Sequence, residues 1–469
     1  RGSVGLYDVD PFAGYFLLQQ NQAAPFLIFK SVNTSGSVDN FHATFPTQPG
    51  FTGPFQALEG GAQLVSSTSS KLAMSTIEGA PKRSYVEQWN LSVQRQLTTD
   101  MSVTLGYVGS HGVHLLMRGD DGNMVGAPST ATPAIKTQFG YLFPQAGATV
   151  NPSLGVVRYI FWNTGSNYHG LNLNLDKKFA HGFQFQLAYT FSKSQDDDSQ
   201  TVAGDTFANG INSPIWWLPK AFYGPSDFNI THTLSLNALY TIPTPKSWNG
   251  VMKETLANWE LGGIVSYNSG TPTTVTNTGD PLGLSNGGAD PYGPLVRVAG
   301  CNPINYQVGG PTVGFLNQNC FTEPSVPTSA LASLPYGCNG FSKVGLVGAT
   351  GKPTSIPAAP SGRTYCANLL PLNVGRNTIN GPNFVNVDFS VHKIFPITRI
   401  SEQFNIQFRA EIFDIFNHSN FNPPQPNSGD TNSGLINSDG SYAGVGNITS
   451  PASLQTPARE IQFALKMQW

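Results

Sequence analysis

Histidines and small nucleophilic residues are the first groups to test for chemistry in this sequence. The run Gly109 to Gly112 sets Ser110 beside His111, but nothing around it resembles the strand-to-helix elbow of a hydrolase, so we predict a turn at a strand end. Residues 348–352 resemble a phosphate loop, yet Pro353 replaces the Ser or Thr that follows the lysine in such loops. The H-E-x-x-H motif and the paired-ligand spacing of a zinc enzyme are missing around six histidines that we considered as metal ligands: His111, His114, His169, His181, His232 and His392. We therefore predict no enzyme activity and no cofactor.

Four aspartates form the best candidate for a metal site. Asp196, Asp197 and Asp198, together with Asp205, would offer carboxylates to a calcium ion in an extracellular loop. The regular ligand spacing of a calcium-binding loop is missing, however. We therefore favour a solvated cluster of loop charges over a metal site.

The cysteines indicate disulfide chemistry. Cys301, Cys320, Cys338 and Cys366 all fall within the long insertion 270–382, and an even number in one exported segment indicates two disulfides in an oxidising compartment. Four cysteines allow three connectivities, of which sequential pairing closes the shortest loops and is preferred. A zinc site lacks the usual Cys-x-x-Cys spacing. The insertion is predicted to be a folded cap that recognises a ligand or a neighbouring cell, or shields the structure beneath it.

The last residues of the chain, 459–469, indicate the kind of fold to which these loops belong. Every second residue is large and apolar, with Glu460, Gln462, Lys466 and Gln468 between them. A strand of this period has one oily and one wet face, as expected of the closing strand of an outer-membrane barrel. The oily residues are Ile461, Phe463, Leu465, Met467 and Trp469.

The same alternation recurs in eight further stretches: residues 89–97, 101–107, 171–176, 183–192, 230–237, 259–267, 385–392 and 404–412. Their connections are alternately short and long, which is typical of periplasmic turns and extracellular loops. The predicted fold is all-β, a transmembrane antiparallel up-and-down β-barrel. Its C-terminus is periplasmic and its long loops are extracellular. Arg95, Lys177 and Lys393 break the apolar face only near periplasmic ends, where long side chains reach the interface.

Strand parity sets the expected organisation. The first and the last of the nine predicted strands both run downward, toward the periplasm. Bacterial barrels have an even number of strands, so a further strand, running upward, is expected within residues 1–84 or before Arg1. A ten-stranded barrel, complete in itself, is the alternative. We divide the chain into residues 1–84 (loop with possibly one strand), 85–269 (strands and loops), 270–382 (the cysteine-containing loop) and 383–469 (closing strands).

Composition agrees with a barrel and excludes other classes. Only 11% of the 469 residues are charged, against about 25% in soluble proteins. The net charge of -2 argues against a nucleic-acid partner, and no run of 18 apolar residues predicts a spanning helix. Five charges lie at lumen-facing positions, where we predict pairing across the inner wall or contact with a plug: Asp388, Arg409, Glu411, Glu460 and Lys466.

Several segments resemble one known family. Residues 85–95 (YVEQWNLSVQR), 106–110 (GYVGS), 167–171 (NYHGL), 189–194 (YTFSKS), 375–377 (GRN), 408–417 (FRAEIFDIFN) and 459–462 (REIQ) are similar to the C-terminal barrel half of Oar-like, TonB-dependent-receptor-like outer-membrane proteins of acidobacteria. The resemblance covers 85–469. It implies a 22-stranded barrel around an N-terminal plug, with import driven by the inner-membrane TonB complex. The family carries a carboxypeptidase-regulatory-like domain, and this sequence shows no plug, TonB box or such domain.

Three functions follow as hypotheses. The first is a receptor barrel that imports a ligand too large for porins, with outer-membrane lipid, the barrel-assembly machinery at the C-terminal strand and, if an upstream plug exists, TonB as partners. The second is a passive pore or adhesin built from a smaller closed barrel. The third is a surface protein that self-assembles through unpaired strand edges.

Overall fold

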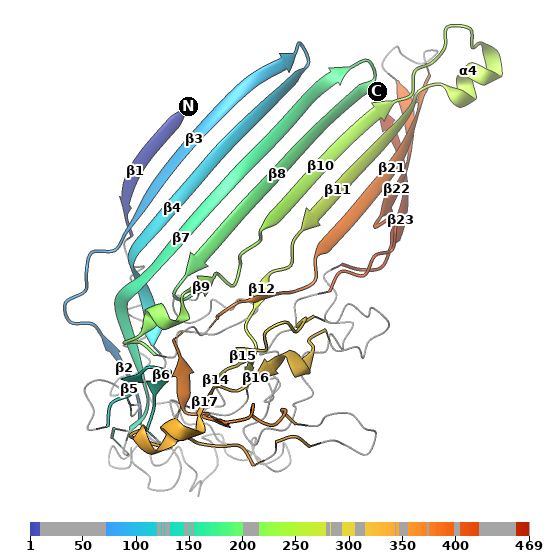
Figure 1. The fold of residues 1–469 in the computed structure, drawn as a ribbon. Helices are drawn as coiled ribbons and strands as arrows, with labels where there is room; N and C mark the ends of the chain where they lie inside the picture. The colour runs from blue at the N-terminus through green and yellow to red at the C-terminus, as the bar shows by residue number, and fades with distance from the viewer. Residues whose placement is uncertain are drawn as a thin grey trace, which may run out of the picture.

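The computed structural model describes residues 1–9, 72–119, 123, 126, 132–144, 150–151, 154–199, 215–277, 282, 293–304, 315–342, 344–346, 355–372, 375–397, 404–421 and 456–468. Its main feature is a 12-stranded, curved sheet whose successive neighbours are antiparallel along one path (Figure 1). The path runs through β1 (Gly2–Asp8), β3 (Tyr85–Thr98), β4 (Met101–Gly119), β7 (Leu154–Ala180), β8 (Phe183–Asp196), β10 (His232–Thr241), β11 (Trp259–Asn268), β21 (Phe384–Pro396), β22 (Asn405–Phe413) and β23 (Glu460–Gln468). The predicted antiparallel, all-β architecture is confirmed.

The first strand is the one that strand parity calls for. β1 pairs antiparallel with β3, from Gly2 opposite Leu91 to Asp8 opposite Tyr85. It therefore runs toward the loop end, opposite to β3. At the ends of the path, β1 and β23 are not paired with each other within the described residues, so these strands form an open, curved wall.

Two strands are longer than the sequence predicts. The alternation predicts strands over residues 101–107 and 171–176, but β4 continues to Gly119 and β7 begins at Leu154. The predicted turn at 109–112 is therefore wrong, because this run lies inside β4. The alternation disappears beyond Gly112, where the ladder is bulged, and no lipid-facing pattern marks the extensions.

Short connections gather at one end of the sheet (Figure 1). His181 and Gly182 join β7 to β8 with φ values of 55° and 79°, as a type I′ hairpin turn requires. In the turn between β3 and β4, the Lys177 ammonium and the Thr98 hydroxyl hold the pKa of Asp100 at about 2. The β10–β11 connection contains α4 (Gly250–Leu256). Among the described residues, no helix is long and apolar enough to cross a membrane.

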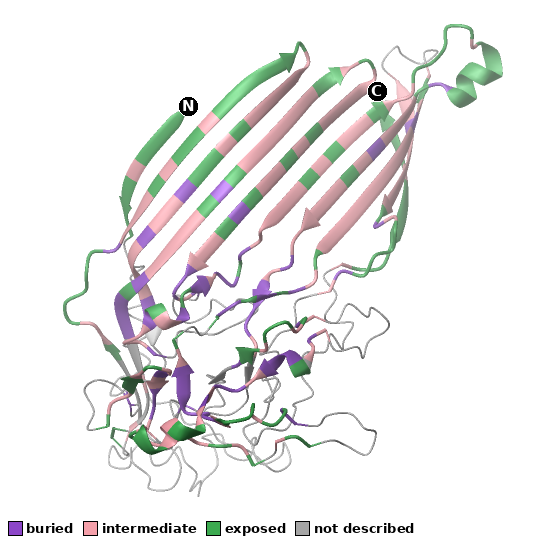
Figure 2. Ribbon diagram, viewed as in Figure 1, coloured by how far each residue is buried: buried purple, intermediate pink, exposed green. Residues whose placement is uncertain are grey.

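The register separates an apolar from a polar face. Leu91, Tyr107, Leu171 and Phe191 are successive cross-strand partners and all four are exposed, as the banding in Figure 2 illustrates. One position nearer the turn end, the cross-strand row is Ser92, Gly106, Asn172 and Thr190, without a large apolar side chain. The apolar row faces outward, as required of a wall that meets lipid on one side and water on the other.

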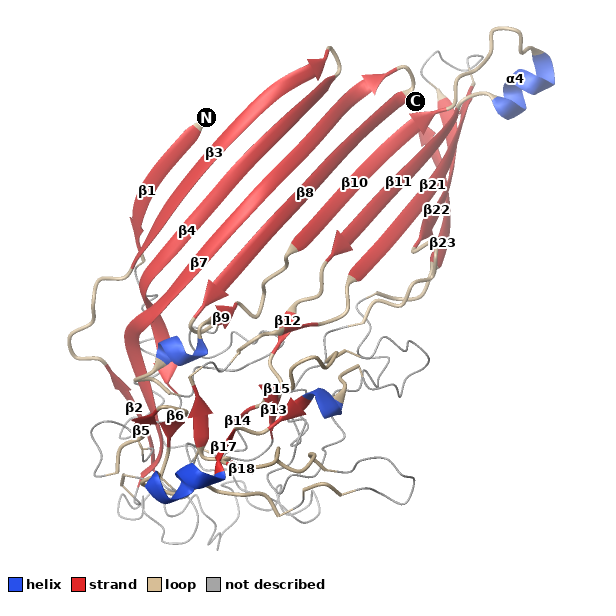
Figure 3. Cartoon of the chain, in the orientation of Figure 1, coloured by secondary structure: helices blue, strands red, loops and turns tan. Residues whose placement is uncertain are grey.

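The loop end carries a separate layer of short elements (Figure 3). Its strands pair as β12 with β20, β13 with β14, β15 with β16, β17 with β18, and β6 with both β19 and β5. The two remaining strands of the main sheet also lie here: β2 pairs parallel with β7, and β9 pairs antiparallel with β8. The bounds are β2 Leu72–Ile77, β5 Ile135–Thr137, β6 Gly140–Leu142, η1 Pro219–Phe222, β9 Gly224–Pro225, β12 Pro272–Thr273, β13 Thr276–Asn277, β14 Gly293–Pro294, β15 Val296–Arg297, η2 Gln318–Cys320, β16 Phe321–Thr322, β17 Ser325–Pro327, η3 Thr328–Ser333, β18 Arg363–Tyr365, β19 Leu369–Pro371 and β20 Ile379–Asn380.

Candidate functional site

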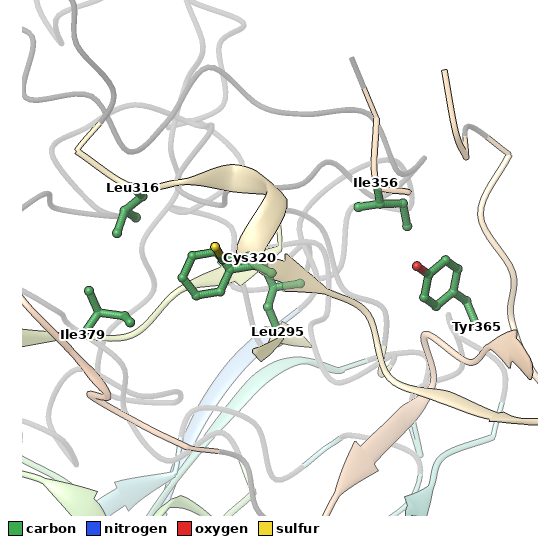
Figure 4. Packing of buried hydrophobic residues seen from close by; sticks show 7 residues of the cluster. Leu295, Leu316, Cys320, Ile356, Tyr365 and Ile379 are labelled. Carbon is green, nitrogen blue, oxygen red and sulfur yellow. The ribbon is translucent and has the colours of Figure 1, made fainter. Parts of the chain in front are cut away.

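The described part of 270–382 folds as a cap with its own small cores. Figure 4 shows one of them, made of Leu295, Leu316, Cys320, Phe321, Ile356, Tyr365 and Ile379. A second packs Leu142, Val326, Cys366 and Leu369. Each core contains one disulfide cysteine, so the crosslinks hold the cap together from within.

The disulfides join the cysteines sequentially. Cys301 is bonded to Cys320 and Cys338 to Cys366, with sequence separations of 19 and 28 residues. This is the pairing that closes the shortest loops. Loop closure of this length stabilises a folded segment by about 3 to 4 kcal/mol per bridge.

The cap is interlocked with the β4–β7 loop. β19 pairs with β6, and the Asn368 side-chain amide donates to the Phe143 carbonyl at 2.9 Å. The Tyr336 hydroxyl donates to the Pro133 carbonyl at 2.7 Å. Three loops of the sequence thus meet in a third core, made of Phe143, Ile215, Phe222, Leu282 and Leu370.

A buried arginine fastens the cap to the mouth of the wall. The Arg376 guanidinium, 2% exposed, pairs with the Asp196 carboxylate at the loop end of β8 and donates to the Asp196 carbonyl at 3.0 Å. It also lies 3.7 Å from a carboxylate oxygen of Asp227. Removing one partner of such a buried pair leaves an uncompensated charge, so the contact is expensive to break.

The neighbouring residue extends the fastening. The Asn377 side-chain amide donates to Asp227 Oδ1 at 2.5 Å and to the Pro225 carbonyl at 2.8 Å. The Thr274 hydroxyl donates to Asn377 Oδ1 and accepts from the Asn377 backbone N–H, both at 2.8 Å. Asn377 has a φ of 56°, a left-handed conformation that asparagine tolerates better than most residues.

Burial changes the acid chemistry of this cluster. Asp227 is 2% exposed, and within the described residues its Oδ2 has no hydrogen-bond partner. Loss of hydration raises the pKa of Asp227, against the opposing effect of the Arg376 charge.

The prediction that the aspartate cluster is solvated is wrong for Asp196 and Asp197. Asp196 and Asp197 are buried because they bind protein groups: Asp197 Oδ2 accepts from the Gly165 N–H and from Lys220 Nζ, each at 2.8 Å. Asp198 is half-buried, and Asp205 lies outside the described residues. Within the described chain, no group of three or more His, Cys, Asp or Glu side chains is placed to hold a metal ion.

The five predicted lumen charges lie at strand positions that alternate with the apolar ones: Asp388, Arg409, Glu411, Glu460 and Lys466. Asp388 Oδ1 accepts from the Asn386 amide at 3.0 Å, and Arg409 donates twice to Gln407 Oε1, at 3.0 and 2.8 Å. Among the described residues, no ion pair joins any two of the five. Their pairing or contact with a plug stays a prediction.

The C-terminal strand presents its apolar residues outward. In β23, Ile461, Phe463, Leu465 and Met467 are 56, 69, 63 and 56% exposed. The Phe463 ring stacks 6.1 Å from that of Phe408 on β22. Trp469 lies outside the described residues.

Sequence reasoning missed the residues that fasten the cap. Arg376, Asn377 and Asp227 belong to no periodic strand, and their partners lie about 150 to 180 positions away in the chain. The signal that could have marked them is the Gly-Arg-Asn run, which carried part of the family resemblance.

These features, a lipid-facing strand wall with a polar inner face and a capped loop end, define a transmembrane β-barrel domain of the outer membrane. The chain belongs to the outer membrane beta barrel domain family, whose model matches residues 1–462. No curated protein matches the chain.

Solved structures offer only distant similarity. The outer membrane transporter YddB from Escherichia coli is 9% identical, with a TM-score of 0.36, over 86% of this chain and 35% of its own. The FrpB iron transporter from Neisseria meningitidis is 10% identical, with a TM-score of 0.31, over 84% and 32%. The pyoverdine receptor FpvA from Pseudomonas aeruginosa is 10% identical, with a TM-score of 0.31, over 83% and 30%. The chain therefore spans about a third of their length.

Proposed function

We propose that the chain forms the C-terminal part of the barrel of an Oar-like, TonB-dependent-receptor-like transporter, which binds and imports a ligand too large for porins. The observation that carries this proposal is the folded cap, which Arg376 and Asn377 fasten to the mouth of a wall whose inner face is polar. A cap held by disulfides and buried ion pairs offers a fixed, shaped surface on which a ligand can bind. A passive pore needs only an open mouth.

The open edges of the wall support a wide barrel. Unpaired strand edges are not tolerated in lipid, so β1 and β23 need further partners or each other. Barrels of about 22 strands have a plugged lumen. We propose that further strands complete the ring around a plug that contacts the TonB complex, with the long loops outside the cell. The barrel-assembly machinery then recognises β23, and outer-membrane lipid covers the apolar face.

Planar-bilayer recording of the protein purified from its native membrane tests this proposal. A plugged receptor is expected to show no steady conductance. A steady, ohmic conductance would contradict the receptor function and favour a passive pore.

The unpaired edges favour one other candidate, a surface protein that assembles through β1 and β23. Electron micrographs of native membranes separate the two. Repeating arrays would support assembly, whereas isolated particles would support the receptor.

A further inference from the structure

Two tyrosine–histidine pairs repeat the same geometry on the outward face of the wall. Tyr107 of β4 and His169 of β7 are joined by a 2.7 Å hydrogen bond between Oη and Nδ1, and their rings stack. Tyr189 of β8 and His232 of β10 are joined in the same way at 2.8 Å, also with stacked rings. In both cases the histidine lies opposite the residue two positions beyond the tyrosine, toward the loop end.

A lysine lies between the pairs. Lys193 of β8 is the direct cross-strand partner of His169, and it is exposed. Phe191, two residues before it, lies opposite His232, with the two ring centroids 5.2 Å apart. His169, Lys193 and His232 therefore form one patch over three adjacent strands, which we call the imidazole–lysine patch. The outward-facing acid Glu87 on β3 lies opposite His111, three strands away from Lys193 along the sheet.

The patch is supported by an aromatic surround. The Trp89 ring lies 6.2 Å from the His169 ring and covers Gly109, where an added Cβ would come within 2.3 Å of it. Rings of this kind mark the boundary between the apolar band of a barrel and the lipid headgroups. The patch thus lies at headgroup level, at the loop end of the band.

The donors of the patch suit an anion. Whichever nitrogen of each histidine carries the proton, the Tyr–His hydrogen bond leaves one N–H or O–H of the pair free to donate outward. Lys193 adds a positive charge and three further donors. Phosphate is the anion at headgroup level, and it accepts several charge-assisted hydrogen bonds at once.

We propose that the imidazole–lysine patch binds the phosphate groups of the phosphorylated glycolipid in the outer leaflet. This inference rests on the orientation in the proposed function, with the long loops outside the cell. It is independent of whether the barrel is plugged or conducts.

Native mass spectrometry of the full protein in detergent tests the proposal, with lipid A, dephosphorylated lipid A and phosphatidylglycerol as probes. The triple variant H169L/K193M/H232L removes the imidazole and ammonium donors of the patch. The control K178M/H181N removes a lysine and a histidine that are exposed at the turn end of the same hairpin, and asparagine tolerates the left-handed conformation of position 181. Heat-modifiable gel migration verifies that each variant is folded.

We expect lipid A to bind the triple variant about tenfold more weakly than the wild type and the control, which corresponds to about 1.4 kcal/mol. Dephosphorylated lipid A should bind all three proteins equally. Unchanged lipid A binding by a folded triple variant would overturn the proposal. The patch would then be only a part of the aromatic belt at the membrane interface. Preferential binding of phosphatidylglycerol would contradict the outer-leaflet source. A conducting channel with the expected lipid selectivity would contradict only the transport function.

Discussion

The wall and the cap are built on opposite principles. In the wall, each strand pairs mainly with its neighbour along the chain, and every second residue repeats the same role. In the cap, the fastening contacts join Arg376 to Asp196, 180 positions away, and Asn368 to Phe143, 225 positions away. The wall thus draws its stability from many weak, repeated contacts, and the cap from a few strong ones that a single substitution can remove.

The largest effect is expected from the substitution Arg376→Met. It leaves Asp196 and Asp227 buried without their cation, which costs about 3 to 5 kcal/mol. Because the contact involves only the last residue of β8, the rest of the wall keeps its strand pairing and only the cap should open. Limited proteolysis measures cap opening, and heat-modifiable migration measures the wall. Loss of the folded wall at the same time would contradict the separation of the two regions. Arg376→Lys keeps the positive charge but lacks the planar, two-pronged guanidinium, so its cap stability should lie between those of the wild type and Arg376→Met.

Removing one disulfide should have the next largest effect. Cys338→Ser with Cys366→Ser should destabilise the cap by about 3 kcal/mol, because the unfolded cap gains conformational entropy when the loop is no longer closed. Cap cleavage at increasing urea concentrations gives the shift. A cap equally resistant with and without the bridge would show that the ion-pair network alone holds it.

A substitution in the wall tests the contact between neighbouring strands at Gly109 and Trp89, which the register places opposite each other. In Gly109→Ala the new methyl would meet the Trp89 ring, and displacing that ring should cost about 1 to 3 kcal/mol. Trp fluorescence during urea unfolding reports this cost. The control is Gly106→Ala on the same strand, where the nearest atom is 3.8 Å away. Equal stability of the two variants would argue against the aromatic cover.

The smallest effect concerns pH. Burial raises the pKa of Asp227, so folding favours its protonated form. The contribution is therefore largest below the ordinary value of 3.8 and is lost as pH rises through the raised folded pKa. We expect wild-type cap stability, relative to Asp227→Asn, to increase as pH falls toward 3.8. A difference that does not change with pH would contradict the raised pKa.

The same contrast explains what the sequence could predict. Residues 183–192 alternate without a break because one side meets lipid and the other water, so composition alone reveals both faces. The extension of β7 from Leu154 does not lie between lipid and water, and residues 156–162 (VVRYIFW) do not alternate between apolar and polar side chains. The partners of Arg376 could not be predicted, because a buried ion pair between distant loops has no local pattern; only the family resemblance of residues 375–377 marks this position.

Cysteine crosslinking in the native outer membrane tests the central claim, that this wall is part of a wide barrel, most directly. The native cysteines are already paired, so introduced thiols report only on each other. Val4→Cys is combined in turn with Cys at Ile461, Phe463, Leu465 or Met467, and Val4→Cys with Trp89→Cys is the control for strands that are paired. We expect an intramolecular crosslink in the control and none between β1 and β23. An efficient intramolecular β1–β23 crosslink would instead show a closed ten-stranded barrel and contradict the receptor architecture.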